Sequence, residues 1–142
     1  MEPMARTGDG LDLALTRVGD RWALRVVDAL LGGPRRFTEL QHDLGDVATN
    51  VLSQRLKQLE QAGVVVARPY STRPLRNAYE LTAEGRELAG ALALLADWGA
   101  RQGDAGETPH HDACGSALEA RWYCPTCERV VDDPDDEPLR YA

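Results

Sequence analysis

The first 113 residues of this 142-residue chain contain no cysteine, and the whole chain contains a single lysine against fifteen arginines. All three cysteines lie between positions 114 and 127, and an odd number at such close spacing argues against the disulfide framework of a small secreted protein. The chain also lacks a long apolar run, because Asp97 interrupts the longest one, Leu88 to Ala100. No positively charged leader with an apolar core opens the sequence, so a cytoplasmic protein that enters no membrane is predicted.

The residue patterns of catalysis are absent as well. The sequence has no Ser/His/Asp arrangement and no glycine-rich phosphate loop, and its only pair of neighbouring histidines, His110 and His111, lies close to the cysteines. The sequence therefore predicts that the protein is not an enzyme.

The acidity of the chain is confined to its C-terminal part. The formal net charge is -7, yet residues 1–103 carry equal numbers of basic and acidic side chains, and residues 104–142 supply the whole excess. Between positions 35 and 76, basic side chains outnumber acidic ones. This distribution predicts a modest basic face in the middle of the chain, of the kind that binds nucleic acid.

Hydrophobic periodicity predicts two helices in the first third of the chain. The spacing of Leu11, Leu15 and Val18 is that of a short amphipathic helix ending at Gly19. Asp20 is a good N-cap for a second helix, which ends at Gly32. The second helix is expected to bury its apolar residues, which are Trp22, Val26, Val27, Leu30 and Leu31.

Two further helices follow at the spacing of a helix-turn-helix. Arg36 and Phe37 are expected to be extended, and Thr38 to form a capping box with Gln41 for a short helix that ends at Gly45. The next helix is predicted from about Thr49 to Ala62, with Gly63 as its C-terminal stop. Its inward face is formed by Leu52, Leu56 and Leu59.

The remainder of residues 1–102 predicts a β-hairpin and a final helix. Val64–Val66 and Asn77–Leu81 read as paired strands, with an exposed tip at Ser71–Pro74. Thr82 is expected to cap one long helix from Ala83 to about Gln102. The apolar face of that helix is wider than one small domain needs, which predicts a dimer. The fold class is therefore mainly α (α+β), a winged helix-turn-helix.

The helix from Thr49 is the predicted recognition helix. Its non-core positions near the N-terminus carry short hydrogen-bonding side chains, among which the amides of Asn50 and Gln54 can pair bidentately with adenine. Basic side chains of this helix and of the hairpin would contact phosphates and make binding fall with salt. The predicted DNA-binding residues are Arg36, Thr49, Asn50, Ser53, Gln54, Lys57, Arg68, Arg73 and Arg76.

Several motifs occur together in this region. They are Gly19-Asp20-Arg21-Trp22, Arg36-Phe37-x-Glu39-Leu40, Leu52-Ser53-Gln54-Arg55-Leu56-x-x-Leu59, Gly63, Tyr79-x-Leu81-Thr82-x-x-Gly85 and Trp98-Gly99. From about Leu15 to Gly99 the chain resembles the HxlR family of bacterial winged-helix transcription regulators. The resemblance implies a homodimer, formed by the terminal helices, that binds palindromic operator DNA in the nucleoid and acts more often as a repressor than as an activator.

The chain departs from this family at two places. Several members sense electrophiles or oxidants through a cysteine before the first core helix, and this chain has none there, so that mode of sensing is not expected. Ala48 stands where the family usually has a serine cap, and Thr49 is an alternative cap. A pocket for a small-molecule effector is expected between the first and last helices, because both have apolar faces.

The tail is predicted to contain a linker at 103–109, a small zinc-ribbon-like unit at 110–131 and an acidic disordered segment at 132–142. Two ligand pairs at zinc-knuckle spacing predict a structural zinc site formed by His111, Cys114, Cys124 and Cys127, with His110 as an alternative fourth ligand. The alternative chemistry is redox, since Cys124-x-x-Cys127 superficially matches a dithiol motif. The alternatives for the whole protein are a winged helix that binds another protein, and a regulator that responds to metal or oxidants through its tail.

Overall fold

The computed structural model describes residues 8–103 and 108–131. Residues 12–93 form one compact unit, and the described residues 8–11 and those from Leu94 onward belong to a second. The predicted acidic segment at 132–142 and most of the predicted linker lie outside the described residues. In the part of the chain that is described, no helix combines the length and the apolar character needed to cross a bilayer.

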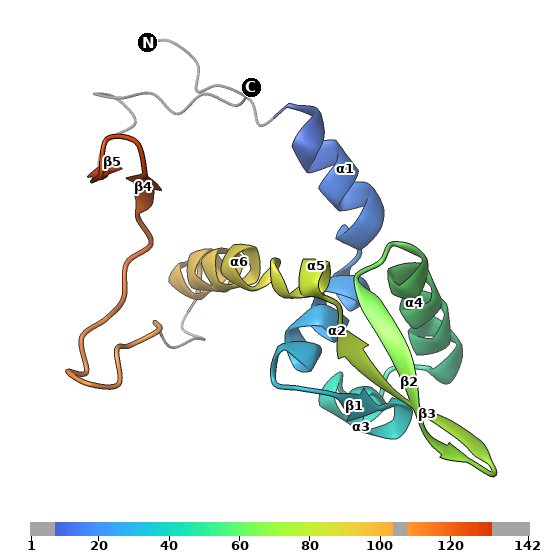
Figure 1. The fold of residues 1–142 in the computed structure, drawn as a ribbon. Helices are drawn as coiled ribbons and strands as arrows, with labels where there is room; N and C mark the ends of the chain where they lie inside the picture. The colour runs from blue at the N-terminus through green and yellow to red at the C-terminus, as the bar shows by residue number, and fades with distance from the viewer. Residues whose placement is uncertain (1–7, 104–107, 132–142) are drawn as a thin grey trace. The chain divides into compact units, whose positions relative to one another are not determined.

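The first compact unit contains most of one helix, four complete helices, the start of a sixth, and three strands (Figure 1). The elements in chain order are α1 (Asp9–Val18), α2 (Arg21–Leu31), β1 (Arg35–Arg36), α3 (Phe37–Asp43), α4 (Thr49–Gln61), β2 (Val65–Thr72), β3 (Leu75–Leu81), α5 (Ala83–Arg86) and α6 (Ala89–Arg101). The strands form an antiparallel sheet in the order β1-β3-β2. The tail adds a separate two-stranded hairpin of β4 (Trp122–Cys124) and β5 (Arg129–Val131).

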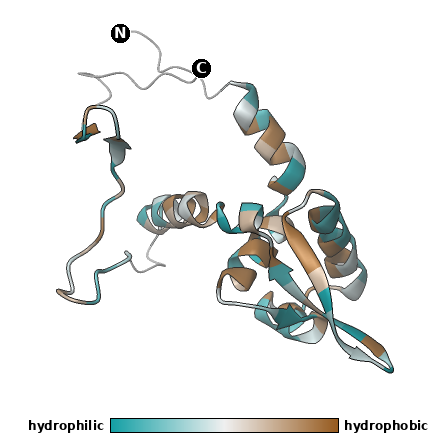
Figure 2. Ribbon diagram, viewed as in Figure 1, coloured by the Kyte–Doolittle hydropathy of each residue, from teal (hydrophilic) through white to brown (hydrophobic). Residues whose placement is uncertain are grey.

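The core lies between α2, α3, α4 and the base of the hairpin. It is built from apolar residues alone, and the predicted inward face of α4 is confirmed because Leu52, Leu56 and Leu59 are almost completely buried. Figure 2 shows that the first part of β2, which joins this core, is apolar. The prediction was wrong for Leu31, which is 38% exposed. It lies at the edge of the helix stripe that buries Val26, Val27 and Leu30, one residue and about 100° beyond the last of them.

Thr82 connects the end of α4 to the end of the hairpin. Its hydroxyl donates to the carbonyl of Gly63 at 2.6 Å and accepts from the N–H of Gly85 at 3.1 Å. A Cβ on Gly85 would meet the carbonyl oxygen of Val64 at 2.2 Å, so only glycine permits this close approach. The Leu-Thr-x-x-Gly motif is thus explained by backbone packing, and the predicted cap at Thr82 is confirmed.

Three other predictions are corrected by the structure. Phe37 begins α3 instead of extending β1, and the N-cap of α3 is Arg36, whose N–H donates to the Glu39 carboxylate at 2.8 Å. The predicted capping box of Thr38 with Gln41 was therefore wrong. The predicted single helix after Thr82 is two helices, because the N–H groups of Glu87 and Leu88 donate three residues back and tighten the backbone there.

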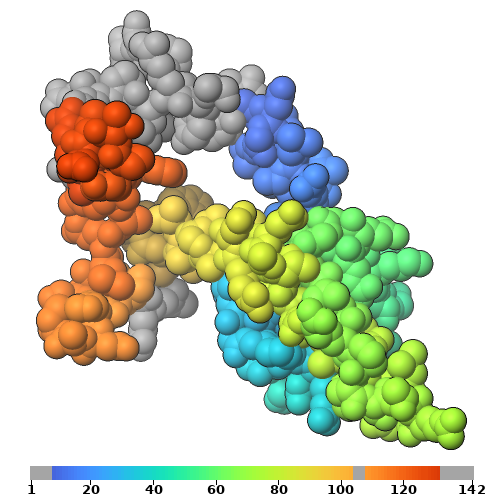
Figure 3. Space-filling model, in the orientation of Figure 1, coloured from blue at the N-terminus to red at the C-terminus, as the bar shows by residue number. Residues whose placement is uncertain are grey.

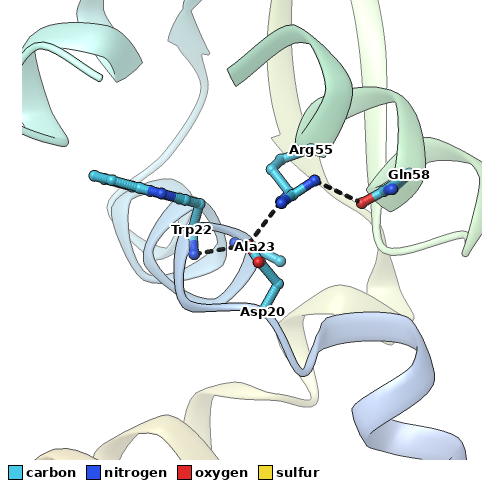
Figure 4. A network of polar contacts seen from close by, with 5 residues as sticks. All are labelled: Asp20, Trp22, Ala23, Arg55 and Gln58. Carbon is cyan, nitrogen blue, oxygen red and sulfur yellow. Dashed lines mark hydrogen bonds and ion pairs between the residues drawn. The ribbon is translucent and has the colours of Figure 1, made fainter. Parts of the chain in front are cut away.

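One carboxylate joins α2 to α4 (Figure 4). The Asp20 Oδ1 atom accepts from the N–H groups of Trp22 at 2.9 Å and Ala23 at 3.2 Å, which makes it the N-cap of α2. The same oxygen accepts from the Nε atom of Arg55 on α4 at 2.7 Å. Asp20 therefore both starts one helix and holds the other helix against it.

Replacing Asp20 should separate these two roles. Asp20→Asn keeps a side-chain oxygen for the helix N–H groups but removes the charge, whereas Asp20→Ala removes both. We expect Asp20→Ala to lower the free energy of unfolding by about 1–2 kcal/mol, and Asp20→Asn by less than about 1 kcal/mol because the ion pair is partly exposed. Urea denaturation followed by circular dichroism measures both losses. Equal losses would contradict a separate capping contribution.

The same carboxylate should make stability depend on pH. The hydrogen bond from Arg55 lowers the pKa of Asp20 below 3.8, helped by the N–H groups of Ala23 and Trp22 and opposed by burial. Because this pKa is lower in the folded state, the ionised carboxylate stabilises the fold above its unfolded pKa, and that stability is lost as pH falls through the folded pKa. Between pH 7 and about pH 3, the unmodified protein should lose more stability than Asp20→Asn. Urea midpoints that fall in parallel would rule this out.

Candidate nucleic-acid interface

The exposed face of α4 is fixed by its buried face. Leu52, Leu56 and Leu59 point into the core, so the opposite side of the helix faces solvent. The five predicted DNA-binding residues of α4 are all exposed, namely Thr49, Asn50, Ser53, Gln54 and Lys57. This face therefore presents short hydrogen-bonding groups, with one cation a turn further along.

The turn between α3 and α4 is held by a glutamine. The Gln41 side chain donates to the carbonyl of Val47 at 2.8 Å and to the Thr49 hydroxyl at 3.2 Å. This role was missed, because Gln41 was assigned to a capping box at the start of α3. The N-cap of α4 is Ala48, which has no side-chain acceptor for the first N–H groups of the helix. The N-terminal end of α4 therefore offers its backbone donors to an external acceptor.

The β2–β3 hairpin projects from the compact body (Figures 1 and 3). Arg73 lies in the turn of this hairpin, and Arg76, the second residue of β3, is exposed. The register of β2 against β3 shifts between Pro69 and Ser71, which leaves Tyr70 as the extra residue of a bulge. The guanidinium of Arg36 lies 4.4 Å from the centre of the Tyr70 ring. This contact between β1 and the hairpin was not predicted. The signal that the sequence offered was a tyrosine, Tyr70, in a mostly polar segment.

Ion pairs divide the basic residues of this region into two groups. Arg35 pairs with Asp43 at 3.3 Å, Arg55 with Asp20, and Arg68 with Glu80 across the hairpin. Within the residues that the structure describes, no ion pair is formed by the other four, which are Arg36, Lys57, Arg73 and Arg76. Arg68 was predicted to bind DNA like the four unpaired residues, but the carboxylate of Glu80 offsets its charge. The unpaired cations lie on α4, at the start of α3 and at the hairpin tip.

The predicted metal ligands form two separate pairs. The Nδ1 atom of His111 lies 3.4 Å from the Sγ atom of Cys114, and Cys124 and Cys127 are joined by hydrogen bonds in the turn between β4 and β5. Among the described residues, no three His, Cys, Asp or Glu side chains are assembled as a metal-binding group. Hydrogen bonds from Ser116 and then His111 lower the pKa of the Cys114 thiol, and donors on Cys127 and Thr126 lower that of Cys124.

The fold and the exposed face of α4 define a winged helix-turn-helix transcription regulator. Residues 17–107 match the model of the family described as HxlR-like helix-turn-helix, and the chain belongs to this family. The resemblance, the fold class and the prediction that the protein is a DNA-binding regulator and not an enzyme are thereby confirmed.

Relatives of the chain are bacterial regulators. The HTH-type transcriptional regulator Rv3095 of Mycobacterium tuberculosis is 36% identical over 128 residues, covering 87% of this chain and 80% of the relative. Similar structures include the redox regulator HypR in its oxidized form, with a TM-score of 0.62 and 25% identity over 68% of this chain and 99% of that one. The reduced form of the transcriptional regulator YodB from Bacillus subtilis gives a TM-score of 0.58 and 26% identity, covering 69% and 96% of the two chains.

Removing an unpaired arginine at the hairpin tip should change the salt dependence of DNA binding. We expect Arg73→Ala and Arg76→Ala each to weaken binding for all sequences alike and to lower the slope of log affinity against log salt by about 1. The matched control is Arg86→Ala, because Arg86 is an exposed arginine beyond the opposite end of β3. Fluorescence anisotropy of labelled duplexes at several salt concentrations measures the slopes. Equal slopes for the tip and control variants would exclude a phosphate contact by the hairpin tip.

Proposed function

We propose that this protein is a homodimeric repressor that binds palindromic operator DNA through α4 and the hairpin. The observation that carries the proposal is the exposed face of α4, on which four short hydrogen-bonding side chains lie beside one cation, Lys57, that forms no ion pair in the described residues. A helix face that contacts only water does not require several short hydrogen-bonding side chains, whereas a helix in the major groove uses them to contact base edges. Family membership supports the DNA-binding part of the proposal.

The residues of α4 divide by the chemistry of their side chains. The amides of Asn50 and Gln54 each offer a donor and an acceptor, so they can read the edge of adenine in the major groove. The N-terminal N–H groups of α4, which lack a side-chain cap, suit a phosphate oxygen. Lys57 and the unpaired arginines would contact the backbone and fix the register of the helix.

The homodimer is supported by apolar faces that the described part of the chain leaves uncovered. In α1, Leu11, Leu13 and Leu15 are at least half exposed. In α6, no residue is buried, and Leu95 and Trp98 are more than half exposed. Exposed apolar helix faces of this kind favour association with a second copy, and a two-fold dimer places two copies of α4 on a palindromic site.

Repression is the outcome that such a dimer produces without further contacts. A protein that covers a promoter excludes the polymerase by occupancy alone, whereas activation needs a surface that recruits it. A reporter gene placed behind the selected operator tests the sign, since deletion of the protein should raise expression. Lower expression after deletion would make the protein an activator.

The base-reading residues should be separable from the phosphate-binding ones. We expect selection from random duplexes to yield a two-fold symmetric site, and Asn50→Ala or Gln54→Ala to lose about 1–3 kcal/mol of discrimination at one base pair of each half-site. Lys57→Ala is the control on the same helix and should weaken binding to all sequences equally. Failure to enrich any common site would refute sequence-specific binding.

The dimer face should be sensitive to a buried charge. Leu95→Glu places two carboxylates in the proposed symmetric interface, and loss of two buried leucines alone should raise the dissociation constant of the dimer by about 100-fold or more. Leu75→Glu is the matched control, because Leu75 is 69% exposed at the hairpin tip. Analytical ultracentrifugation distinguishes monomer from dimer. If both variants remain dimeric, α6 is not the interface.

A further inference from the structure

The small unit of residues 108–131 has no hydrophobic core. None of its side chains is buried, and four of its large apolar residues are half exposed or nearly so, namely Leu118, Trp122, Tyr123 and Val130. A two-stranded hairpin is marginally stable in water, and a unit of this size without a core needs a crosslink or a metal. What stabilises this unit must therefore come from groups other than its apolar side chains.

The first half of the unit is a tight hairpin that carries His111 and Cys114. The N–H of His111 donates to the carbonyl of Ser116 at 2.9 Å, and a bridge between His110 and Ala117 continues the pairing. Four residues form the loop. Its last residue, Gly115, has a φ of +71°, and its N–H donates to the carbonyl of His111 at 2.7 Å.

The second half repeats this arrangement with Cys124 and Cys127. Cys124 is paired with Arg129 at the end of the β4–β5 hairpin, and four residues again form the loop between them. The last loop residue, Glu128, has a φ of +51°, which is uncommon for a residue other than glycine. The two turns thus share one design, in which the first proposed ligand is the last backbone-paired residue before a four-residue loop, the second is the third loop residue, and a residue with positive φ follows.

This shared design suits metal binding because it directs two side chains to one side of each turn. The His111 Nδ1 and Cys114 Sγ atoms already lie 3.4 Å apart. Backbone N–H groups of Thr126 and Cys127 donate to the Cys124 sulfur, and the N–H of Ser116 donates to that of Cys114.

We infer that residues 108–131 bind one Zn²⁺ ion through His111 Nδ1 and the sulfur atoms of Cys114, Cys124 and Cys127. The two pairs are not assembled into one site in the described residues, so binding would bring the two hairpins together. The three thiols release their protons to solvent on binding, and His111 binds as the neutral ring. Four protein ligands leave no open position for water, so the ion has a structural role. His111 is preferred to His110 because only His111 lies beside a cysteine sulfur.

The test uses the full-length protein purified without chelator. We expect one zinc per chain by inductively coupled plasma mass spectrometry, and replacement by Co²⁺ should give the intense visible bands of a tetrahedral ion with sulfur-to-metal charge transfer. Cys114→Ser, Cys124→Ser, Cys127→Ser and His111→Ala should each lower the bound metal by about tenfold or more. His110→Ala is the matched control and should keep full metal content.

Each alternative result overturns the assignment in a different way. Protein without metal that takes up neither Zn²⁺ nor Co²⁺ refutes the site, and a Cys124–Cys127 disulfide in that protein would indicate redox chemistry. Loss of metal in His110→Ala but not in His111→Ala refutes the ligand set. These readouts do not involve DNA, so they stand whether or not the proposed operator binding is found.

Discussion

The hydrogen bonds of Asp20 are the interaction on which the presentation of α4 depends (Figure 4). Burial of three leucines on α4 fixes which face turns inward, but apolar contacts alone are non-directional and permit small rotations of the helix. The bond from Arg55 to the capping carboxylate of α2 is directional and links the two helices. The orientation of the exposed face of α4 therefore depends on this carboxylate as well as on the buried leucines.

Charge pairing decides which arginines are available to DNA. A chain with no net charge in residues 1–103 can still bind a polyanion if its acidic groups neutralise some cations and leave others free. That is the arrangement found here, since Arg35, Arg55 and Arg68 are engaged with carboxylates. The cations left without such partners in the described residues lie on α4, at the start of α3 and at the hairpin tip. Counting basic residues along the sequence overstates the basic face, and the ion pairs correct the count.

Much of the fold was predictable because its strongest patterns are local. The periodic leucines of α4, the cap at Asp20 and the glycine stop at Gly63 each specify structure within a few residues. One error was itself local, since Phe37 joins a helix because the Glu39 carboxylate accepts the N–H of Arg36 three residues before it. Other features depend on contacts between distant segments, and β1 exists only through pairing with β3. The exposed face of α4 was likewise predicted from the sequence. The pairing of Arg68 with Glu80 and the contact of Arg36 with Tyr70 were not, because they depend on strand register and on a bulge that the sequence does not reveal.

Different forces stabilise the winged helix and the tail. This difference explains why the sequence is informative about the tail, although the tail has little apolar packing. In the winged helix, stability comes from burial, so contacts between apolar side chains define the structure. In residues 108–131 burial contributes little, and the structure is held by the hydrogen bonds of two tight turns and by N–H donors to sulfur. Ligand spacing is a local property, so it is readable from sequence in the same way as a helix cap. What spacing cannot supply is the force that would join two hairpins without a core, and the proposed metal ion would supply that force without any apolar contact.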